Sequence, residues 1–360
     1  MTTNDICRRR LAAQFLTTLG PARPSELIRA LGAVQSQDYA GAKWGLAQRL
    51  RGVTDAAIER EIDEGRILRT HVLRPTWHFV AAEDLRWMLE LTAPRVNVAN
   101  AHYSRHLGID REVFRRSDAV LAKALSGGKF LTRAELRLEL AHAGLKIPTG
   151  QHLSHLMMQA ELDGVVCSGP RRGKQFTYAL LDERAPASGI SSRDEALSEL
   201  ARRYFATRSP ATPQDFAWWS GLTIKDAKRG IDLAGRDLEA VTLGGQNYWV
   251  SSAAPRPPRP ARTVFLLPNY DEYFIGFRDR RAFGDRIGHT RPITGGTALI
   301  PHVIVIDGQL VGAWKRVIEK NRVRVALSFM TTLSAAERKG VGEAVRRLGA
   351  FLESPVEIDA

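Results

Sequence analysis

Two glutamines separated by a single residue, Gln35 and Gln37, are the polar pair in this sequence whose spacing could do chemistry. They stand in the segment GAVQSQD (32–38), where Gly32 favours an extended stretch over a helix. Residues two apart diverge on a helix but share a face on an extended segment, so both amides could converge on one small group. Each carboxamide offers a donor and an acceptor without charge. The alternative is that both are solvated surface residues, as glutamine usually is, and the spacing leaves that open.

A pair of adjacent carboxylates, Asp271 and Glu272, stands among aromatic residues in PNYDEYFIGF (268–277). Carboxylates in apolar surroundings can become acids or bases with shifted pKa values. Adjacent residues on a strand point to opposite sides, so only one of the two could face a pocket. We favour a turn-capping role for Asp271. A small-molecule hydrolase or sensor built around Asp271 is one functional hypothesis.

The spacing of the histidines and cysteines in the sequence does not predict a metal site. The candidates are two histidine pairs and two isolated cysteines, namely His102 with His106, His152 with His155, Cys7 and Cys167. Neither histidine pair has a third ligand at a suggestive spacing. Two cysteines are too few for a disulfide framework. We therefore predict no metal, no cofactor and no disulfide bridge.

Basic residues outnumber acidic residues in this chain. Lys plus Arg total 52 against 39 for Asp plus Glu, a formal net charge of +13, and such an excess usually marks a polyanionic partner such as nucleic acid. A GC-rich genome, which encodes many arginines, is the alternative explanation. No segment approaches the run of about 18 apolar residues that spans a membrane, and the start MTTNDICRRR lacks a secretory signal. We therefore expect a cytoplasmic, nucleoid-associated protein with no membrane contact.

Several basic residues occur where they could bind phosphate. The segment VVCSGPRRGKQFTYALL (165–181) predicts a hairpin whose tight turn carries Arg171, Arg172 and Lys174, with a merely solvated turn as the alternative. In LRTHVLRPTWHFV (68–80), a cation on an apolar strand is costly unless it is paired with a carboxylate or a phosphate, so an internal salt bridge competes with DNA binding. The DNA-binding candidates outside the hairpin are Lys43, Arg69, Arg74, Thr76 and His78.

The middle of the chain predicts a winged helix. LTRAELRLELAHAG (131–144) is typical of an amphipathic helix that Thr132 caps and Gly144 ends, and GQHLSHLMMQAELDGVV (150–166) predicts a second helix. The basic hairpin follows immediately. Two helices followed by a two-stranded wing are the elements of a winged helix, whose second helix and wing usually meet the nucleic-acid backbone.

The same pattern recurs more loosely on either side, and linker-like segments at 182–195 and 251–263 divide the chain. We predict an α+β fold with three tandem winged-helix units, over 1–125, 126–185 and 190–252. A C-terminal β-rich, barrel-like domain follows over 262–360. Its expected elements include strands at TVFLLP and YFIGF, a hairpin turn at Asp307-Gly308 and a terminal helix at 334–352.

Five blocks of this sequence, in order, resemble the winged-helix DNA glycosylases of the AlkZ-like and YcaQ-like type. The blocks are LGAVQSQDYAGAKWGLAQR (31–49), LRPTWHFVAAEDL (73–85), RRYFATRSPATPQDFAWWSGL (202–222), LLPNYDEYFIGFRDR (266–280) and IVIDGQLVGAWKR (304–316). The resemblance runs through almost the whole chain. It implies three winged helices and a C-terminal β-rich part around a concave basic surface.

The resemblance also implies site residues and a substrate class. Gln35 and Gln37 match the Gln-x-Gln motif of the AlkZ-like branch, and we assign Asp38 a supporting charge. Members of the family excise alkylated purines, including bulky N7 adducts, and some unhook interstrand crosslinks. A lesion-approaching hairpin is expected at Ile306, Asp307, Gly308 and Gln309, with the basic loop 278–292 as a rival.

An N7-alkylpurine carries a positive charge and leaves as a neutral base, so its release needs little or no protonation. The enzyme must instead place water beside C1′ and stabilise the positive charge that develops there. We therefore predict a monomeric, monofunctional glycosylase that acts on double-stranded DNA, with Gln37 as the main water-orienting residue. The alternative is a winged-helix transcriptional regulator that binds DNA and performs no chemistry.

Overall fold

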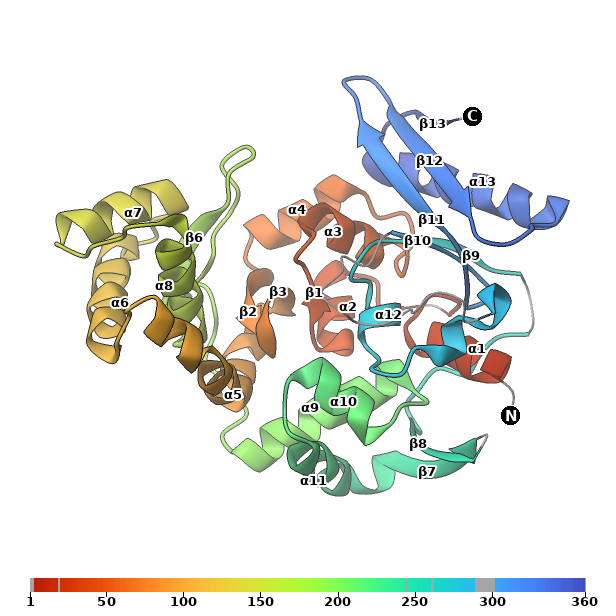
Figure 1. Cartoon of the computed structure of the whole chain (residues 1–360), viewed down its shortest axis with the longest axis horizontal. Helices are drawn as coiled ribbons and strands as arrows, with labels where there is room; N and C mark the ends of the chain where they lie inside the picture. Colours follow the sequence, from red (N-terminus) through yellow and green to blue (C-terminus); the bar gives the residue numbers. More distant parts are fainter. Residues whose placement is uncertain (1–2, 19, 244, 260–261, 289–301, 360) are drawn as a thin grey trace.

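The computed structural model describes residues 3–18, 20–243, 245–259, 262–288 and 302–359. The fold mixes α and β structure, as predicted (Figure 1). The N-terminal part consists of α1 (Thr3–Ala13), α2 (Pro24–Leu31), β1 (Val34–Gln35), α3 (Tyr39–Ala47), α4 (Asp55–Asp63), β2 (Ile67–Val72) and β3 (Arg74–Ala81). β3 lies between β1 and β2 in an antiparallel sheet.

The second part is mostly helical and ends in the predicted hairpin. It consists of α5 (Leu85–His106), α6 (Arg111–Leu125), β4 (Leu131–Thr132), α7 (Arg133–His142), α8 (Gly150–Leu162), β5 (Val166–Ser168) and β6 (Thr177–Leu180). Thr132 caps α7 as predicted, in a reciprocal capping box with Glu135. The hairpin turns at Gly173-Lys174, where Arg172 and Gln175 exchange two backbone hydrogen bonds. The two hairpin strands and β4 form a three-stranded sheet in the order β4-β6-β5.

The third part repeats the order of helices before a hairpin. Its elements are α9 (Arg193–Arg208), α10 (Pro213–Ser220), α11 (Ile224–Ala234), β7 (Leu238–Leu243) and β8 (Gln246–Ser251). β7 and β8 pair antiparallel, as predicted. Short 3-10 turns occur at Ala82–Asp84, Leu181–Glu183, Gly235–Asp237, Arg281–Phe283 and Asp285–Ile287.

The C-terminal part contains the largest sheet. Its elements are β9 (Val264–Leu267), α12 (Glu272–Ile275), β10 (Val303–Ile306), β11 (Gln309–Ile318), β12 (Val323–Phe329), α13 (Ala335–Leu352) and β13 (Val356–Ile358). The strand order is β13-β12-β11-β10-β9, and only the β12–β13 pair is parallel. The terminal helix and the two-residue turn at Asp307-Gly308 are confirmed.

The predicted strand at YFIGF is wrong, because these residues form the short helix α12. Asp271 caps this helix by accepting a hydrogen bond from the backbone N–H of Tyr273 at 2.9 Å. The aromatic side chains that suggested a strand are fully buried from the helix instead: Tyr273 is 0% and Phe274 1% exposed. The winged-helix division and the barrel-like closure remain predictions.

The two ends of the chain share one hydrophobic core. One apolar cluster joins Trp44 of α3 and Phe79 of β3 to Trp314 of β11 and Phe351 of α13. The Trp44 indole N–H donates to the Leu266 carbonyl of β9 at 2.7 Å. The N-terminal elements that carry the glutamines therefore owe their positions partly to the C-terminal sheet.

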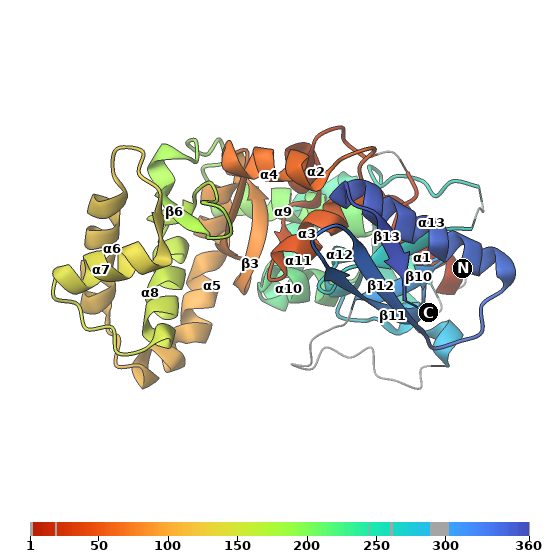
Figure 2. The same cartoon turned by 90° about the horizontal axis from the view of Figure 1, so that it is seen from above.

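The parts lie in a row (Figure 2), with α6, α7 and α8 at one end and the C-terminal sheet with α13 at the other. The loops of the β5–β6 and β11–β12 hairpins project toward the same side of the molecule, with α3 and α4 between them (Figure 1). Among the described residues, no helix is both long enough and apolar enough to cross a membrane.

Asp118 of α6 and Asp163, which caps α8, make a pH-dependent contact between these helices. Burial, and then the neighbouring Asp163 carboxylate, raise the pKa of Asp118 to about 7. Because an unfolded aspartate titrates near a pKa of about 3.9, the folded state binds an extra proton between these values, and stability falls as pH rises through this range. We expect Asp118→Asn to raise the melting temperature at pH 8, with a difference from wild type that shrinks toward pH 5. An equal difference at both pH values would contradict this coupling.

Candidate active site

Gln35 belongs to a row of polar residues across the N-terminal sheet. It pairs with His78 of β3, which in turn pairs with Thr70 of β2. Directly opposed residues of an antiparallel sheet project to the same face. Gln35 is 8% exposed and His78 and Thr70 are 0% exposed, whereas Gln37, two residues further on, is exposed. The row therefore holds Gln35 at the edge of the protein interior and leaves Gln37 in solvent.

Two hydrogen bonds fix Gln35. Its backbone N–H donates to Glu272 Oε1 at 2.9 Å, and its side-chain Oε1 accepts from Arg74 Nη2 at 3.0 Å. A guanidinium has no acceptor, so this contact identifies which end of the amide is the carbonyl. The amide group of Gln35 thus turns its oxygen toward Arg74 and keeps its N–H donors for other contacts.

A buried ion pair anchors the backbone around Gln35. Glu272 Oε2 accepts from Arg208 Nη2 at 2.6 Å and from the Trp219 indole N–H at 2.9 Å. The Glu272 and Arg208 side chains are 1% and 0% exposed. Arg208 also donates to the Leu31 carbonyl at the end of α2, at 2.9 Å. Glu272 therefore connects the strand that carries Gln35 to α9 and α10.

Asp271 is equally committed to the interior. Arg49 donates to both of its carboxylate oxygens, at 2.8 and 2.9 Å, and both side chains are 2% exposed. This contact and the cap of α12 occupy the oxygens that a hydrolytic centre would need. The hypothesis of a small-molecule hydrolase or sensor around Asp271 is therefore wrong.

Gln37 and Asp38 lie between β1 and α3. Asp38 caps α3, because its Oδ1 accepts from the Gly41 N–H at 2.9 Å, and its Oδ2 lies 4.0 Å from His302 Nε2. Within the described part of the chain, no protein group is hydrogen bonded to the Gln37 amide. Asp38 therefore has a structural role as the cap of α3, and its supporting role in catalysis remains a prediction.

Arg69 holds the residue between the two glutamines. Its Nε and Nη2 both donate to the Ser36 carbonyl at 3.2 Å, and its guanidinium lies 4.4 Å from the centroid of the Trp77 ring. Burial lowers the Arg69 pKa without removing its charge, because an arginine starts from about 12.5 or higher. Ser36 is thereby clamped from the β2 side.

Comparisons with known proteins identify the family of this chain. A model of the family described as DNA glycosylase AlkZ-like matches residues 28–351. The chain belongs to the AlkZ-like DNA glycosylase family. An interstrand DNA cross-link repair glycosylase from Streptomyces sahachiroi is 23% identical over 319 residues, which cover 85% of each chain. The solved structure of the Streptomyces sahachiroi DNA glycosylase AlkZ covers all of both chains with a TM-score of 0.78 and 22% identity, so the fold is shared.

Two predicted DNA contacts of this glycosylase are wrong because the side chains are buried. The Lys43 ammonium, in a side chain that is 3% exposed, is paired with the carboxylates of Asp55 and Glu59. His78 is fully buried, and burial together with the positive charge of Arg74 lowers its pKa well below the usual value. Lys43, on α3, is thus part of an internal ion pair.

Arg69 and Arg74 donate to the Ser36 and Gln35 carbonyls, and their contact with phosphate remains a prediction. Burial lowers the Arg74 pKa to about 10, so the side chain stays charged at neutral pH. The Thr76 hydroxyl oxygen is buried without a hydrogen-bond partner among the described residues, and its contact with DNA remains a prediction. Sequence reasoning missed that Arg69 and Arg74 contact the segment that carries the two glutamines.

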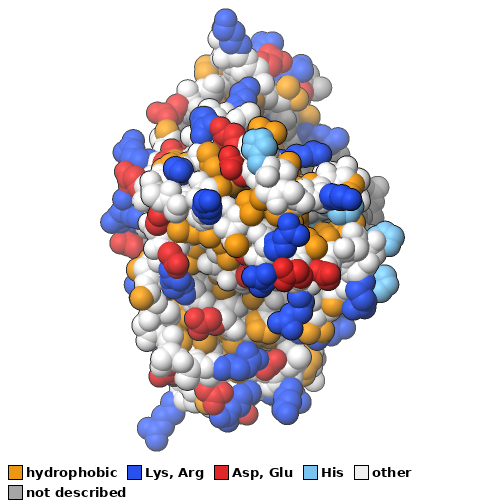
Figure 3. All heavy atoms as spheres, turned by 90° about the vertical axis from the view of Figure 1, so that its left-hand side faces the viewer, with side chains coloured by type: hydrophobic (Ala, Val, Ile, Leu, Met, Phe, Trp, Pro, Cys, Tyr) orange, Lys and Arg blue, Asp and Glu red, His pale blue; other side chains and the backbone are white. Residues whose placement is uncertain are grey.

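The three basic residues of the β5–β6 hairpin differ from one another. The Arg171 N–H donates to Asp63 Oδ1 at 3.0 Å, and its guanidinium lies 3.6 Å from Glu59, so it faces the N-terminal part. Arg172 is exposed but pairs with Glu135 at 2.8 Å. Lys174 is exposed at the turn, with no protein partner among the described residues. The end of the molecule that carries this hairpin has Lys and Arg interspersed with Asp and Glu, not one continuous basic patch (Figure 3).

The predicted lesion-approaching hairpin forms, but its turn is packed against the protein, and its approach to a lesion remains a prediction. Ile306 is 0% and Gln309 2% exposed. The Gly308 carbonyl accepts from the Tyr273 hydroxyl at 3.0 Å, and Asp307 Oδ1 accepts from the Thr263 N–H at 2.8 Å. These contacts tie the turn to β9 and α12. In the rival loop, residues 278–288 form short turns against the core, and 289–292 lie outside the described residues.

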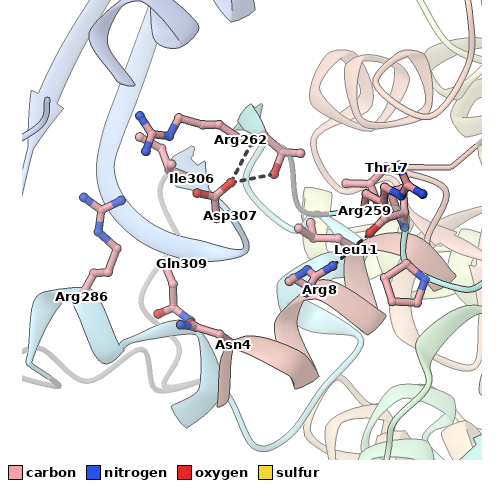
Figure 4. Close-up of a pocket in the computed structure, with 13 residues that line it drawn as sticks. Asn4, Arg8, Leu11, Thr17, Arg259, Arg262, Arg286, Ile306, Asp307 and Gln309 are labelled. Atoms are coloured by element: carbon pink, nitrogen blue, oxygen red, sulfur yellow. Dashed lines mark hydrogen bonds between the residues drawn. The ribbon is translucent and has the colours of Figure 1, made fainter. Parts of the chain in front are cut away.

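The same turn lines a pocket on the side of α1 (Figure 4). The pocket has a volume of about 520 Å³, and its basic lining residues are Arg8, Arg259, Arg262 and Arg286. Arg286 is neutralised by Glu337 at 2.9 Å, and Arg8 donates to the Pro258 carbonyl. Neither Gln35 nor Gln37 lines this pocket.

Proposed function

We propose that this glycosylase releases cationic N7-alkylated purines from duplex DNA by directing water to C1′ of the deoxyribose. The observation that supports this most is the contrast between its two glutamines. Gln37 presents a solvent-exposed amide without a protein partner in the described structure, directly after the clamped Ser36 and the anchored Gln35. An exposed amide on a fixed backbone can bind a substrate or a water without first breaking an internal contact.

The two amides have different tasks in this proposal. Because the Gln35 carbonyl accepts from Arg74, Gln35 offers mainly its N–H donors, and the acceptor for a water proton comes from Gln37. The water thus donates to the Gln37 carbonyl and accepts from the Gln35 amide N–H. Neither amide is a general base of useful strength. Catalysis depends on position and on the electrostatic stabilisation of the developing cation.

The cavity beside Gln35 is too small to enclose a damaged base, which favours a site where the base stays outside. The cavity that touches Gln35, together with Arg49, Asp271 and Glu272, has a volume of about 10 Å³. Such a cavity has room for about one water molecule and none for a purine. In this proposal the damaged base therefore remains outside this cavity and is not flipped into it.

Substrate selectivity tests this mechanism. We expect purified protein to release N7-methylguanine from a duplex, detected as alkali-labile abasic sites on a gel, and to leave uracil and hypoxanthine in place. A neutral base needs a proton as it departs, which two amides cannot supply. Efficient release of uracil would contradict the mechanism even if N7-methylguanine were also excised.

We extend the proposal to interstrand crosslinks joined through N7. The Streptomyces sahachiroi relative is named for crosslink repair, and a site that leaves the base outside can accommodate an adduct tied to the other strand. The same gel assay on a crosslinked duplex tests this point. Persistence of the crosslinked band, with monoadducts cleaved, would restrict the substrate class to monoadducts.

The DNA partner and the winged-helix units belong to the same proposal. The order of helices, strands and wing over 111–180 supports a winged helix, and the exposed Lys174 at its turn suits a phosphate contact. We propose that the protein binds duplex DNA as a monomer. Membership of a glycosylase family favours the enzyme over the DNA-binding regulator.

A further inference from the structure

We propose that the β5–β6 hairpin holds the Ser36-Gln37 segment in its working position, through Phe176 and Arg171 beside its turn. This inference rests on the proposed function, because it assigns positioning residues to that site. The contacting residues Tyr39, Glu59, Arg69, Arg171 and Phe176 are called the latch below. The latch joins the hairpin of the second part to the segment that carries the glutamines.

Phe176 makes the first contacts of the latch. Its ring meets the Tyr39 ring edge-to-face, with centroids 5.0 Å apart. The Arg69 guanidinium lies 4.8 Å from the Phe176 centroid and donates twice to the Ser36 carbonyl at 3.2 Å. One guanidinium therefore connects the hairpin to the residue between the two glutamines. Tyr39 follows Asp38 directly, so the hairpin contacts the segment on both sides of Gln37.

Arg171 makes the second set of contacts. Its guanidinium lies 5.3 Å from the centroids of both the Tyr39 and Phe176 rings and 3.6 Å from Glu59. Glu59 accepts a hydrogen bond from the Tyr39 hydroxyl at 2.8 Å. The backbone is fixed as well, because the Arg69 N–H donates to Ser168 Oγ of β5 at 2.8 Å. The hairpin is thus attached along its length to β2 and to the start of α3.

The latch is separate from the support of the hairpin itself. Thr177 Oγ1 donates to the Pro170 carbonyl at 2.6 Å, and Arg172 pairs with Glu135 at 2.8 Å. Phe176 is 39% exposed, so truncating it opens no cavity in a core. The hairpin is therefore expected to stay folded without the Phe176 ring, while Arg69 loses one of the three aromatic rings that restrict it.

Neighbouring positions of one hairpin would then perform different tasks. Lys174 at the turn contacts DNA phosphate in the proposed function, whereas Phe176 and Arg171 place Gln37. Removing a phosphate contact weakens duplex affinity and lowers its salt dependence. Removing a positioning contact lowers the rate of the bound complex, because a displacement of about 1 Å can cost about 100-fold in rate.

The test uses the full chain and a duplex that carries N7-methylguanine. The variants are Phe176→Ala, Phe176→Tyr and Lys174→Ala, with Phe329→Ala as the matched control. Phe329 is 36% exposed and also lies beside an arginine, Arg338 at 5.7 Å, but it is on β12. Single-turnover excision rates with protein in excess report positioning, and dissociation constants for undamaged duplex at several salt concentrations report binding.

We expect Phe176→Ala to lower the single-turnover rate by about 10-fold or more while its duplex affinity stays close to wild type. Phe176→Tyr, which keeps the ring, is expected to restore the rate, and Phe329→Ala to match wild type. The Lys174→Ala defect is expected to disappear as protein concentration rises, with a salt slope smaller by about one unit. The Phe176→Ala defect is expected to persist at any protein concentration.

A wild-type single-turnover rate for Phe176→Ala would overturn the proposal, and so would a loss that higher protein concentration restores. If thermal melting finds Phe176→Ala unfolded, Phe176→Leu keeps the apolar volume without the ring and is judged by the same two results. Gln37→Ala in the same assay separates the two claims. Full activity of Gln37→Ala would refute the catalytic pair, whereas the Phe176 variants decide the latch alone.

Discussion

Gln37→Ala is expected to lower excision of N7-methylguanine by about 100- to 1,000-fold while duplex affinity stays within about 2-fold. In the proposed mechanism Gln37 supplies the acceptor that orients the water, and nothing else in the described site is both exposed and directly joined to the clamped Ser36. Gln35→Ala is expected to act in the same direction, because it removes the N–H donors that hold the water. Single-turnover rates and dissociation constants measured on one duplex distinguish the two effects.

The control for these variants is Gln214→Ala, which removes another exposed glutamine, near the start of α10. We expect it to keep wild-type excision and affinity. A DNA-binding protein that only regulates would show no excision to lose in any of the forms. Equal loss of affinity and excision in Gln37→Ala would mean that Gln37 binds DNA and does not position water.

Glu272→Gln is expected to have the largest effect on stability. The substitution keeps the shape of the side chain but leaves the Arg208 guanidinium, which is 0% exposed, without its carboxylate. Breaking a buried pair from one side typically costs about 3 to 5 kcal/mol, because an uncompensated charge remains in the interior. Urea unfolding, followed by linear extrapolation to water, measures the change in the free energy of unfolding.

Asp194→Ala provides the contrasting ion pair. Asp194 binds Arg229 at 2.8 Å, but the two side chains are 56% and 55% exposed, so its removal is expected to cost less than about 1 kcal/mol. Glu272→Gln should also lower the excision rate at temperatures where it is folded, because Glu272 accepts from the Gln35 backbone. A cost for Glu272→Gln as small as that for Asp194→Ala would show that the pair is not an anchor.

The orientation of Gln35 illustrates how structural and chemical roles overlap in this site. Arg74 and Arg69 looked like phosphate contacts in the sequence because cations on apolar strands need an anion. The fold gives them carbonyl oxygens instead, those of Gln35 and Ser36. A neutral carbonyl partner leaves most of the positive charge in place, so these arginines also keep the surroundings of the glutamines electropositive, as a DNA-binding site requires.

Local sequence signals predicted those features that depend on a few neighbouring residues. The capping box at Thr132, the hairpin turn at Gly173-Lys174 and the turn at Asp307-Gly308 were all predicted and confirmed. Each is determined by backbone preferences and hydrogen bonds within about four residues. The Gln35–Gln37 spacing alone left a solvated pair open, and the role of these glutamines, implied by the family resemblance, remains a prediction.

Tertiary structure alone decided which polar residues were free. Glu272 lies 237 positions from Gln35 and Asp271 lies 222 from Arg49, and no periodicity in the sequence links residues so far apart. The ion pairs of Lys43, the packing of the Asp307-Gly308 turn and the contact of Phe176 with Tyr39 likewise could not be found from the sequence pattern. Burial makes an unpaired charge costly. Buried cations such as Lys43, Arg49 and Arg208 are therefore paired with carboxylates of the same chain. The amino-acid sequence determined the elements and the glutamine pair, whereas long-range packing determined that Gln37 and Lys174 remain available to a partner.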